Sequence, residues 1–183
     1  VGFTGSTSVG ATLIKIANAR PVPIPVFAEM GSVNPNIIFP GALASRSDAI
    51  IDQIAASIAQ RHGQQCTCPG VVFLYGCSDG IPFARTLANK LAAIPPRRML
   101  SASVASNFAK AVATIRAARD VELVSSSASQ PTGDAVPCVL YCPGPEALAQ
   151  SQVVLDTEMF GPGVIVVDDA GSDGDFMQFD GSL

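Results

Sequence analysis

Three short runs of the sequence contain residue types that can perform chemistry on a carbonyl group. Cys66 ends the run Gly-Gln-Gln-Cys, and its thiolate would be a strong nucleophile. Glu29 ends an otherwise apolar run, where a carboxylate is suited to act as a general base. Glu158 and Phe160, in the run Glu-Met-Phe-Gly-Pro, pair an acid with a ring that could contact a sugar and a flat heterocycle. Together these are the groups needed to oxidise an aldehyde with a nicotinamide cofactor.

The acid and the cysteine also have simpler interpretations. Glu29 could be a strand-end acid that faces water, and Cys66 could be a buried structural thiol, as cysteines often are. Cys66 and His62 could instead form the nucleophilic pair of a cysteine hydrolase. His62, however, is expected in the last turn of a helix, where it would interact with the helix dipole.

A metal site is a further alternative. One histidine and four cysteines offer a mixed set of zinc ligands: His62, Cys66, Cys68, Cys138 and Cys142. The spacings C-x-C and C-x₃-C are unusual for structural zinc, and the second pair falls in a valine-rich run. We therefore expect no metal in this chain.

A phosphate contact is indicated close to the N-terminus. Gly5 and Ser6 stand between a short apolar run and a helix-like pattern, where backbone N–H groups and the helix dipole favour a phosphate. The run 5–10 lacks the lysine of a P-loop and the spacing of the G-x-G-x-x-G motif. A plain turn is the simpler interpretation.

The elements that must position these residues alternate between strands and helices. We expect strands at 1–4, 24–29, 36–39, 71–75, 136–141 and 163–167. We expect helices ending at Arg20, running from Ser47 or Asp48 to Arg61, and at 81–93 and 101–118. Arg97-Arg98 should be a solvated turn, 125–133 a loop and 170–183 an acidic tail. The alternation predicts an α/β fold with three α/β/α layers and a mainly parallel sheet.

Composition narrows the class of protein. The 183 residues are sufficient for one domain with a hydrophobic core. Only 14% are charged, where a soluble domain usually has about 25%, so we expect a segment of a longer protein with part of its surface covered. The net charge of −4 argues against nucleic acid, and no apolar run is long enough for a membrane helix. Five cysteines, an odd number, indicate reduced thiols and a cytoplasmic location.

Taken together, the runs resemble the aldehyde dehydrogenase family. Residues 3–6 are similar to its F-T-G-S turn, and residues 29–35 to its E-L-G-G-x-N-P stretch. Residues 63–66 are similar to the G-Q-x-C nucleophile motif, and residues 158–162 to E-x-F-G-P. Order and approximate spacing agree over most of 1–169. The runs around Glu29 and Cys66 most resemble the α-ketoglutaric semialdehyde dehydrogenase branch.

The resemblance implies a role for each residue of the three runs. Cys66 would attack the aldehyde, and Glu29 would activate the water that hydrolyses the resulting thioester. Glu158 would bind the ribose next to the nicotinamide, with Phe160 packed beside it. The cofactor would be NAD or NADP and the substrate an aldehyde. The full-length protein would be a homo-oligomer that binds neither nucleic acid nor a membrane.

The resemblance also implies a catalytic-domain segment at 1–183, with 1–20 as a strand, turn and helix on the cofactor side. Gly5 and Ser6 would contact a cofactor phosphate there. The family's oxyanion asparagine would lie upstream of Val1, so the segment alone is expected to be inactive. Ser32 stands where many members have glycine. The alternatives are a non-catalytic interaction domain that keeps only the fold, or the cysteine hydrolase.

Overall fold

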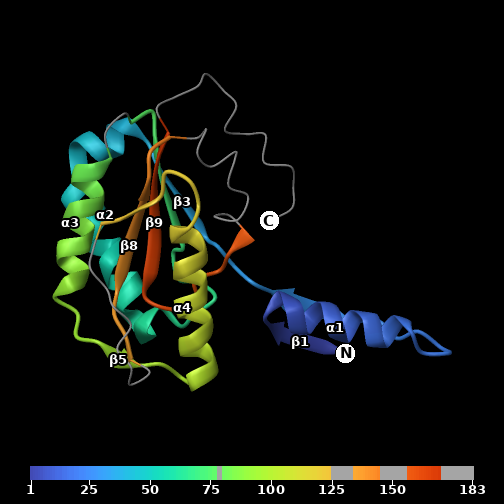
Figure 1. Ribbon diagram of the computed structural model, residues 1–183. Coiled ribbons are helices and arrows are strands. Elements are labelled where there is room, and N and C mark those ends of the chain that lie inside the picture. The colour runs from blue at the N-terminus through green and yellow to red at the C-terminus, as the bar shows by residue number, and fades with distance from the viewer. Residues whose placement is uncertain (78–79, 125–133, 145–155, 170–183) are drawn as a thin grey trace. The chain divides into compact units, whose positions relative to one another are not determined.

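The computed structural model describes residues 1–77, 80–124, 134–144 and 156–169 (Figure 1). Contacts within the chain divide it into two compact units, Val1–Ser32 and Val33–Leu183. The loop expected at 125–133 and the acidic tail expected at 170–183 lie outside the described residues. A single domain over 1–183 stays a prediction.

The first unit is a strand, a helix and a second strand. Its elements are β1 (Gly2–Gly5), α1 (Thr7–Asn18) and β2 (Phe27–Met30), and the two strands pair in parallel. Met30 packs against α1, because a Cβ built on Gly10 would lie 2.0 Å from the Met30 sulfur. The second strand begins later than expected, after the prolines at 23 and 25, since proline cannot donate to a sheet ladder.

The second unit is built around a five-stranded sheet. Its strands, in spatial order, are β3 (Pro35–Ile38), β4 (Val71–Tyr75), β9 (Gly163–Asp169), β8 (Cys138–Cys142) and β6 (Glu122–Leu123). The first four run parallel, and only β6 is antiparallel to its neighbour. The buried run Val71–Tyr75 forms the strand that the sequence predicts, because continuous apolar residues suit a strand covered on both faces.

Helices cover both faces of this sheet (Figure 1). The helices α2 (Pro40–Ala59) and α3 (Ile81–Ala92) pack on one face, and α4 (Ala102–Arg116) packs on the other. Each face has its own buried apolar cluster: Ile58, Leu74, Leu87 and Leu91 belong to the first, and Phe73, Phe108, Ile115 and Leu140 to the second. The predicted three-layer α/β/α fold with a mainly parallel sheet is therefore confirmed.

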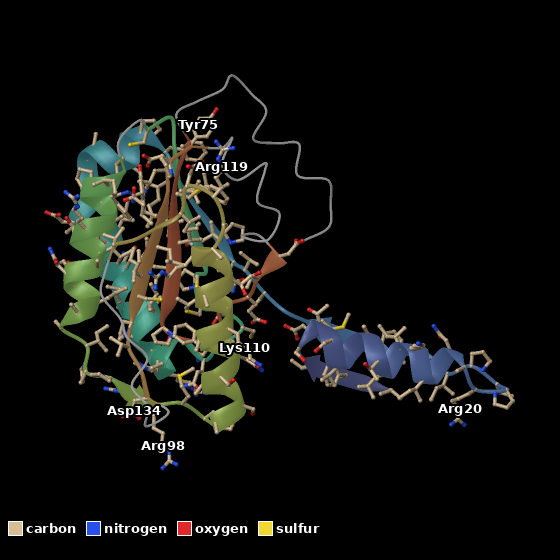
Figure 2. All side chains as sticks on the ribbon, viewed as in Figure 1. Arg20, Tyr75, Arg98, Lys110, Arg119 and Asp134 are labelled. Carbon is tan, nitrogen blue, oxygen red and sulfur yellow. The ribbon has the colours of Figure 1, made fainter. Side chains whose placement is uncertain are left out.

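Two local expectations differ from the structure. A break at Arg46 (φ −150°, ψ 31°) divides α2 into two segments, and the second begins at Ser47, where the sequence predicts a helix start. The first segment, from Pro40, was not expected, although proline suits the first turn of a helix. Arg97-Arg98 is a short strand, β5, rather than a turn. It pairs antiparallel with β7 (Asp134–Ala135), which brings Arg98 opposite Asp134 (Figure 2).

Among the helices of the described residues, none combines the length and the apolar character that a membrane span needs.

Candidate active site

The backbone reverses sharply just before the cysteine motif. A short 3₁₀ turn, η1 (Gln60–Gly63), follows α2, and three successive residues have positive φ: Arg61 (47°), His62 (57°) and Gly63 (67°). This left-handed stretch ends the helix and directs the chain into residues 64–70, which we call the Cys66 turn. The turn leads into β4, a central strand of the sheet. Cys66 thus lies on a loop that is anchored at both ends by regular structure.

The two cysteines of this turn have opposite environments. Cys66 is exposed, whereas Cys68 is buried. Burial raises the pKa of the Cys68 thiol from 9.0 to about 11, because the low-dielectric surroundings disfavour the thiolate. Cys68 is therefore a neutral thiol at physiological pH, and Cys66 is the cysteine of this pair that solvent can reach.

Side-chain amides hold the Cys66 turn in place. Gln64 Oε1 accepts a hydrogen bond from the backbone N–H of Leu100 over 2.7 Å, and Gln64 Nε2 donates to the carbonyl of Arg61 over 3.2 Å. Asn34 Nδ2 donates to the carbonyl oxygens of Cys66 and Cys68, the latter over 3.1 Å. The turn is thus tied both to the segment before α4 and to the segment before β3.

The Glu-Met-Phe-Gly-Pro motif lies directly against the cysteine motif. A Cβ on Gly63 would come within 2.1 Å of the Gly161 carbonyl oxygen, and a Cβ on Gly161 within 2.5 Å of the Phe108 ring. Glu158 and Phe160 are half-buried on either side of Met159, which is buried. The second unit therefore brings two of the three chemical motifs together.

His62 is a buried residue rather than an exposed partner for the cysteine. Its side chain is 2% exposed, and Nε2 lies 2.7 Å from the carbonyl oxygen of Ala135. The carbonyl can only accept, so Nε2 carries the proton, and Nδ1 is buried without a partner among the described residues. The expected last helical turn is instead a left-handed turn beyond α2. This arrangement favours a structural role for His62 over that of a base for Cys66.

Within the described residues, no group of three or more histidine, cysteine, aspartate or glutamate side chains is placed to hold a metal ion. All five cysteines are thiols.

The other predicted site residues lie in the first unit. Glu29 is exposed in this unit, which agrees with the alternative of a strand-end acid that faces water rather than with an acid held among apolar groups. Side chains alternate along β2, and α1 covers the face that carries Met30, which leaves Phe27 and Glu29 on the open face. A short strand pair with one helix can cover only one face of its sheet.

Gly5 and Ser6 lie where β1 passes into α1. Ser6 is the N-cap residue of α1, with extended backbone (φ −66°, ψ 147°), and its side chain makes no capping hydrogen bond. The first turn of the helix contains no acidic residue. No acidic side chain in the first turn of α1 therefore compensates the positive end of the helix dipole. The first backbone N–H groups of this helix suit an anion such as a phosphate.

The fold and this arrangement define the class of protein: a three-layer α/β/α domain with an exposed cysteine on a turn ahead of a central strand. The model of the aldehyde dehydrogenase family matches residues 1–94. The chain belongs to the aldehyde dehydrogenase family.

Individual relatives agree with this assignment. The chain is 36% identical to alpha-ketoglutaric semialdehyde dehydrogenase 2 of Azospirillum brasilense over 167 residues, covering 91% of the chain and 32% of that protein. It is 31% identical to the alpha-ketoglutaric semialdehyde dehydrogenase of Acinetobacter baylyi over 166 residues, again covering 91% of the chain and 32% of the relative. The chain thus spans about a third of the length of these relatives.

A solved structure shows the same fold. Methylmalonate-semialdehyde dehydrogenase from Oceanimonas doudoroffii superposes with a TM-score of 0.70 at 16% identity, covering 94% of this chain and 36% of that one. The narrower resemblance to the α-ketoglutaric semialdehyde dehydrogenase branch is likewise supported by the two relatives.

Sequence reasoning did not assign a role to Asn34 or Gln64, although both lie inside the recognised motifs. Asn34 stands before a proline, and Gln64 stands two residues before Cys66. The position of Asn34 next to a proline turn signal, and that of Gln64 within the nucleophile motif, are the only hints of a role that the sequence offers for these two amides. The contacts themselves, with Cys66 and Leu100, depend on tertiary folding and cannot be read from spacing.

Proposed function

We propose that this chain carries the nucleophile and part of the cofactor site of an enzyme that oxidises an aldehyde to a carboxylic acid with NAD or NADP. The observation that carries the proposal is the Cys66 turn. It presents an exposed thiol on a turn whose Gly63 contacts Gly161 of the motif that carries Glu158 and Phe160, while Cys68, Cys138 and Cys142 are buried. Family membership adds the class of reaction.

The first step uses Cys66. Its thiolate adds to the aldehyde carbon, which forms a C–S bond and places the electron pair of the C=O bond on oxygen. The resulting alkoxide would be held by a backbone N–H near Cys66, because a fixed donor stabilises charge that develops during the reaction. A turn that is anchored by two side-chain amides keeps such a donor in one position.

The chain also offers groups that fit a dinucleotide. Ser6 and the open first turn of α1 would bind a phosphate, and Glu158 would bind ribose hydroxyls beside Phe160. A bound nicotinamide would supply the hydride acceptor that allows the adduct on Cys66 to become a thioester. Glu29 would then take a proton from water, and the hydroxide would attack the thioester carbon. The carboxylic acid leaves and the Cys66 thiolate returns.

The substrate we propose is α-ketoglutaric semialdehyde, on the support of two relatives that carry this name. We further propose a cytoplasmic homo-oligomer that binds neither nucleic acid nor a membrane. The chain spans about a third of its relatives, so we expect little dehydrogenase turnover from residues 1–183 alone.

The experiment that tests this function compares Cys66→Ser with Cys77→Ser in the full-length protein. Cys77 is a half-buried thiol in a loop after β4 and serves as the matched control. Oxidation of α-ketoglutaric semialdehyde is followed with NAD and with NADP. We expect Cys66→Ser to abolish turnover and Cys77→Ser to retain it. Turnover that survives in Cys66→Ser would remove Cys66 from the mechanism.

The role of Glu29 needs a separate measurement. Glu29→Gln should preserve formation of the thioester and slow its hydrolysis, because the amide cannot take a proton from water. Mass spectrometry of the full-length variant after one turnover should then detect the acyl group on Cys66. A variant that hydrolyses the thioester at the wild-type rate would contradict the assignment.

A further inference from the structure

Asn34 connects the two sides of the Cys66 turn. Its Nδ2 donates to the carbonyl oxygen of Cys66 and, over 3.1 Å, to the carbonyl oxygen of Cys68. A primary amide has two N–H groups, so one nitrogen can satisfy both acceptors. The two carbonyls lie on either side of Thr67, where the chain passes from an exposed cysteine to a buried one.

Asn34 itself is held by the sheet. Its φ is 47°, in the left-handed region that asparagine adopts more readily than most residues. The neighbouring Val33 carbonyl accepts from the N–H of Gly70 over 2.9 Å, and Pro35 is opposite Val71 at the start of the β3–β4 pair. A Cβ on Gly70 would lie 2.6 Å from the Val33 carbonyl oxygen, so the two segments are in close contact. The Asn34 amide therefore contacts the Cys66 turn from a backbone segment that the start of the β3–β4 pair holds in place.

We propose that Asn34 is a positioning residue for the Cys66 nucleophile. Its amide fixes the peptide units around Thr67, so that the thiol of Cys66 faces solvent and that of Cys68 stays buried. The inference rests on the proposed function, in which Cys66 attacks a carbonyl. That attack needs the sulfur and the oxyanion-binding N–H in one fixed geometry, and a displacement of about 1 Å can cost about 100-fold in rate.

Two substitutions remove the amide without preventing the backbone conformation. Asn34→Gly keeps access to positive φ, and Asn34→Asp keeps the side-chain shape but points an acceptor at two carbonyl oxygens. Asn36→Ala is the matched control. The Asn36 amide is two residues away and donates to the carbonyl of Asn34 over 2.9 Å, not to the Cys66 turn.

The first measurement is the alkylation rate of Cys68 in the 183-residue chain, with iodoacetamide and peptide mass spectrometry. Cys142, buried in β8, reports global opening. We expect the ratio of Cys68 to Cys142 labelling to rise by about tenfold in both Asn34 variants, the effect of losing two hydrogen bonds. Asn36→Ala should leave the ratio unchanged. The inference is overturned if the ratio of Cys68 to Cys142 labelling is unchanged in the Asn34 variants. An equal rise in labelling at both cysteines leaves this ratio unchanged and overturns the inference as well.

The second measurement separates positioning from simple stability. Alkylation of Cys66 by iodoacetamide needs only a thiolate, whereas its acylation by p-nitrophenyl acetate also benefits from a positioned oxyanion donor. We expect the acylation-to-alkylation ratio of Asn34→Gly to fall by about 10- to 100-fold, toward that of a peptide spanning 64–70. An unchanged ratio overturns the positioning role.

The same data distinguish a failure of this inference from a failure of the proposed function. If the wild-type ratio already equals that of the peptide, the turn gives Cys66 no positioned donor, and the proposed nucleophile fails together with its positioning residue. If the wild-type ratio is high and Asn34→Gly keeps it, the function stands and the role of Asn34 alone is refuted.

Discussion

The backbones of Gly63 and Gly161 are in direct contact: a Cβ on Gly63 would lie 2.1 Å from the carbonyl oxygen of Gly161. Gly161 is in turn covered by the ring of Phe108, which would lie 2.5 Å from a Cβ on Gly161. The cysteine motif at 63–66 and the motif at 158–162 are far apart in the sequence but are therefore in contact. Phe108 of α4 packs against the second motif. This contact fixes where the Glu158–Pro162 segment runs relative to the turn that carries Cys66.

Substitution of Gly63 should be costly. Gly63→Ala would add a Cβ at a position with φ 67° and against the Gly161 carbonyl, so both backbone strain and overlap oppose it. We expect the free energy of unfolding in urea to fall by roughly 2–4 kcal/mol. Gly41→Ala is the control, because a Cβ there meets nothing within 4 Å in the first turn of α2. Equal stability of Gly63→Ala and Gly41→Ala would contradict the contact.

Tyr141 satisfies a buried carboxylate. Its hydroxyl donates to Asp168 Oδ2, which also accepts from the N–H of Gly80 over 2.7 Å. Asp168 is 3% exposed, and its Oδ1 has no partner among the described residues. Tyr141→Phe should lower the free energy of unfolding by about 1–3 kcal/mol, because it removes a donor from a buried acceptor.

A double-mutant cycle isolates this contact. In an Asp168→Asn background the charge is gone, so Tyr141→Phe should cost less there than in the wild type. Chemical denaturation of the four proteins provides the comparison. The same cost in both backgrounds would show that Tyr141 acts independently of Asp168.

Stability should decline at alkaline pH. Burial raises the pKa of Cys68 from 9.0 to about 11, and burial with the carboxylates of Asp120 and Asp168 does the same for Cys142. Between these values the unfolded chain loses the two protons while the folded chain keeps them. The stabilisation is therefore complete below pH 9 and is lost as the pH rises toward 11.

Urea midpoints measured from pH 8 to pH 11 test this dependence. A Cys68→Ala/Cys142→Ala variant should show a flatter pH profile than the wild type, whatever its absolute stability. A wild-type midpoint that is constant over this range, or one that rises, would show that the two thiols are not buried as described.

The fold was largely predictable because its central elements have strong local signals. Val71–Tyr75 is a continuous apolar run, and Ser101 caps α4 by accepting from the N–H of Val104. The segment of α2 after the break at Arg46 begins where the sequence predicts a helix, whereas the short segment from Pro40 to that break was not expected. The pairing of Arg98 with Asp134 depends on a distant segment, which two residues of sequence cannot reveal.

The candidate site was predictable by residue type but not by contact. The motifs identify Cys66 and Glu158 as chemical groups, yet the packing of Gly63 on Gly161 arises only when β9 enters the sheet. The sequence left two environments open for Glu29, among apolar groups or facing water, because the choice depends on which face of β2 the single helix covers.

The most direct test of the central claim is the alkylation rate of each of the five cysteines in the native chain at pH 7.5, resolved by peptide mass spectrometry. The account predicts that Cys66 reacts at least about tenfold faster than the half-buried Cys77, and that Cys68 and Cys142 stay protected until the chain unfolds. Labelling of Cys77 or Cys68 as fast as Cys66 would contradict the claim that the turn presents Cys66 as the nucleophile.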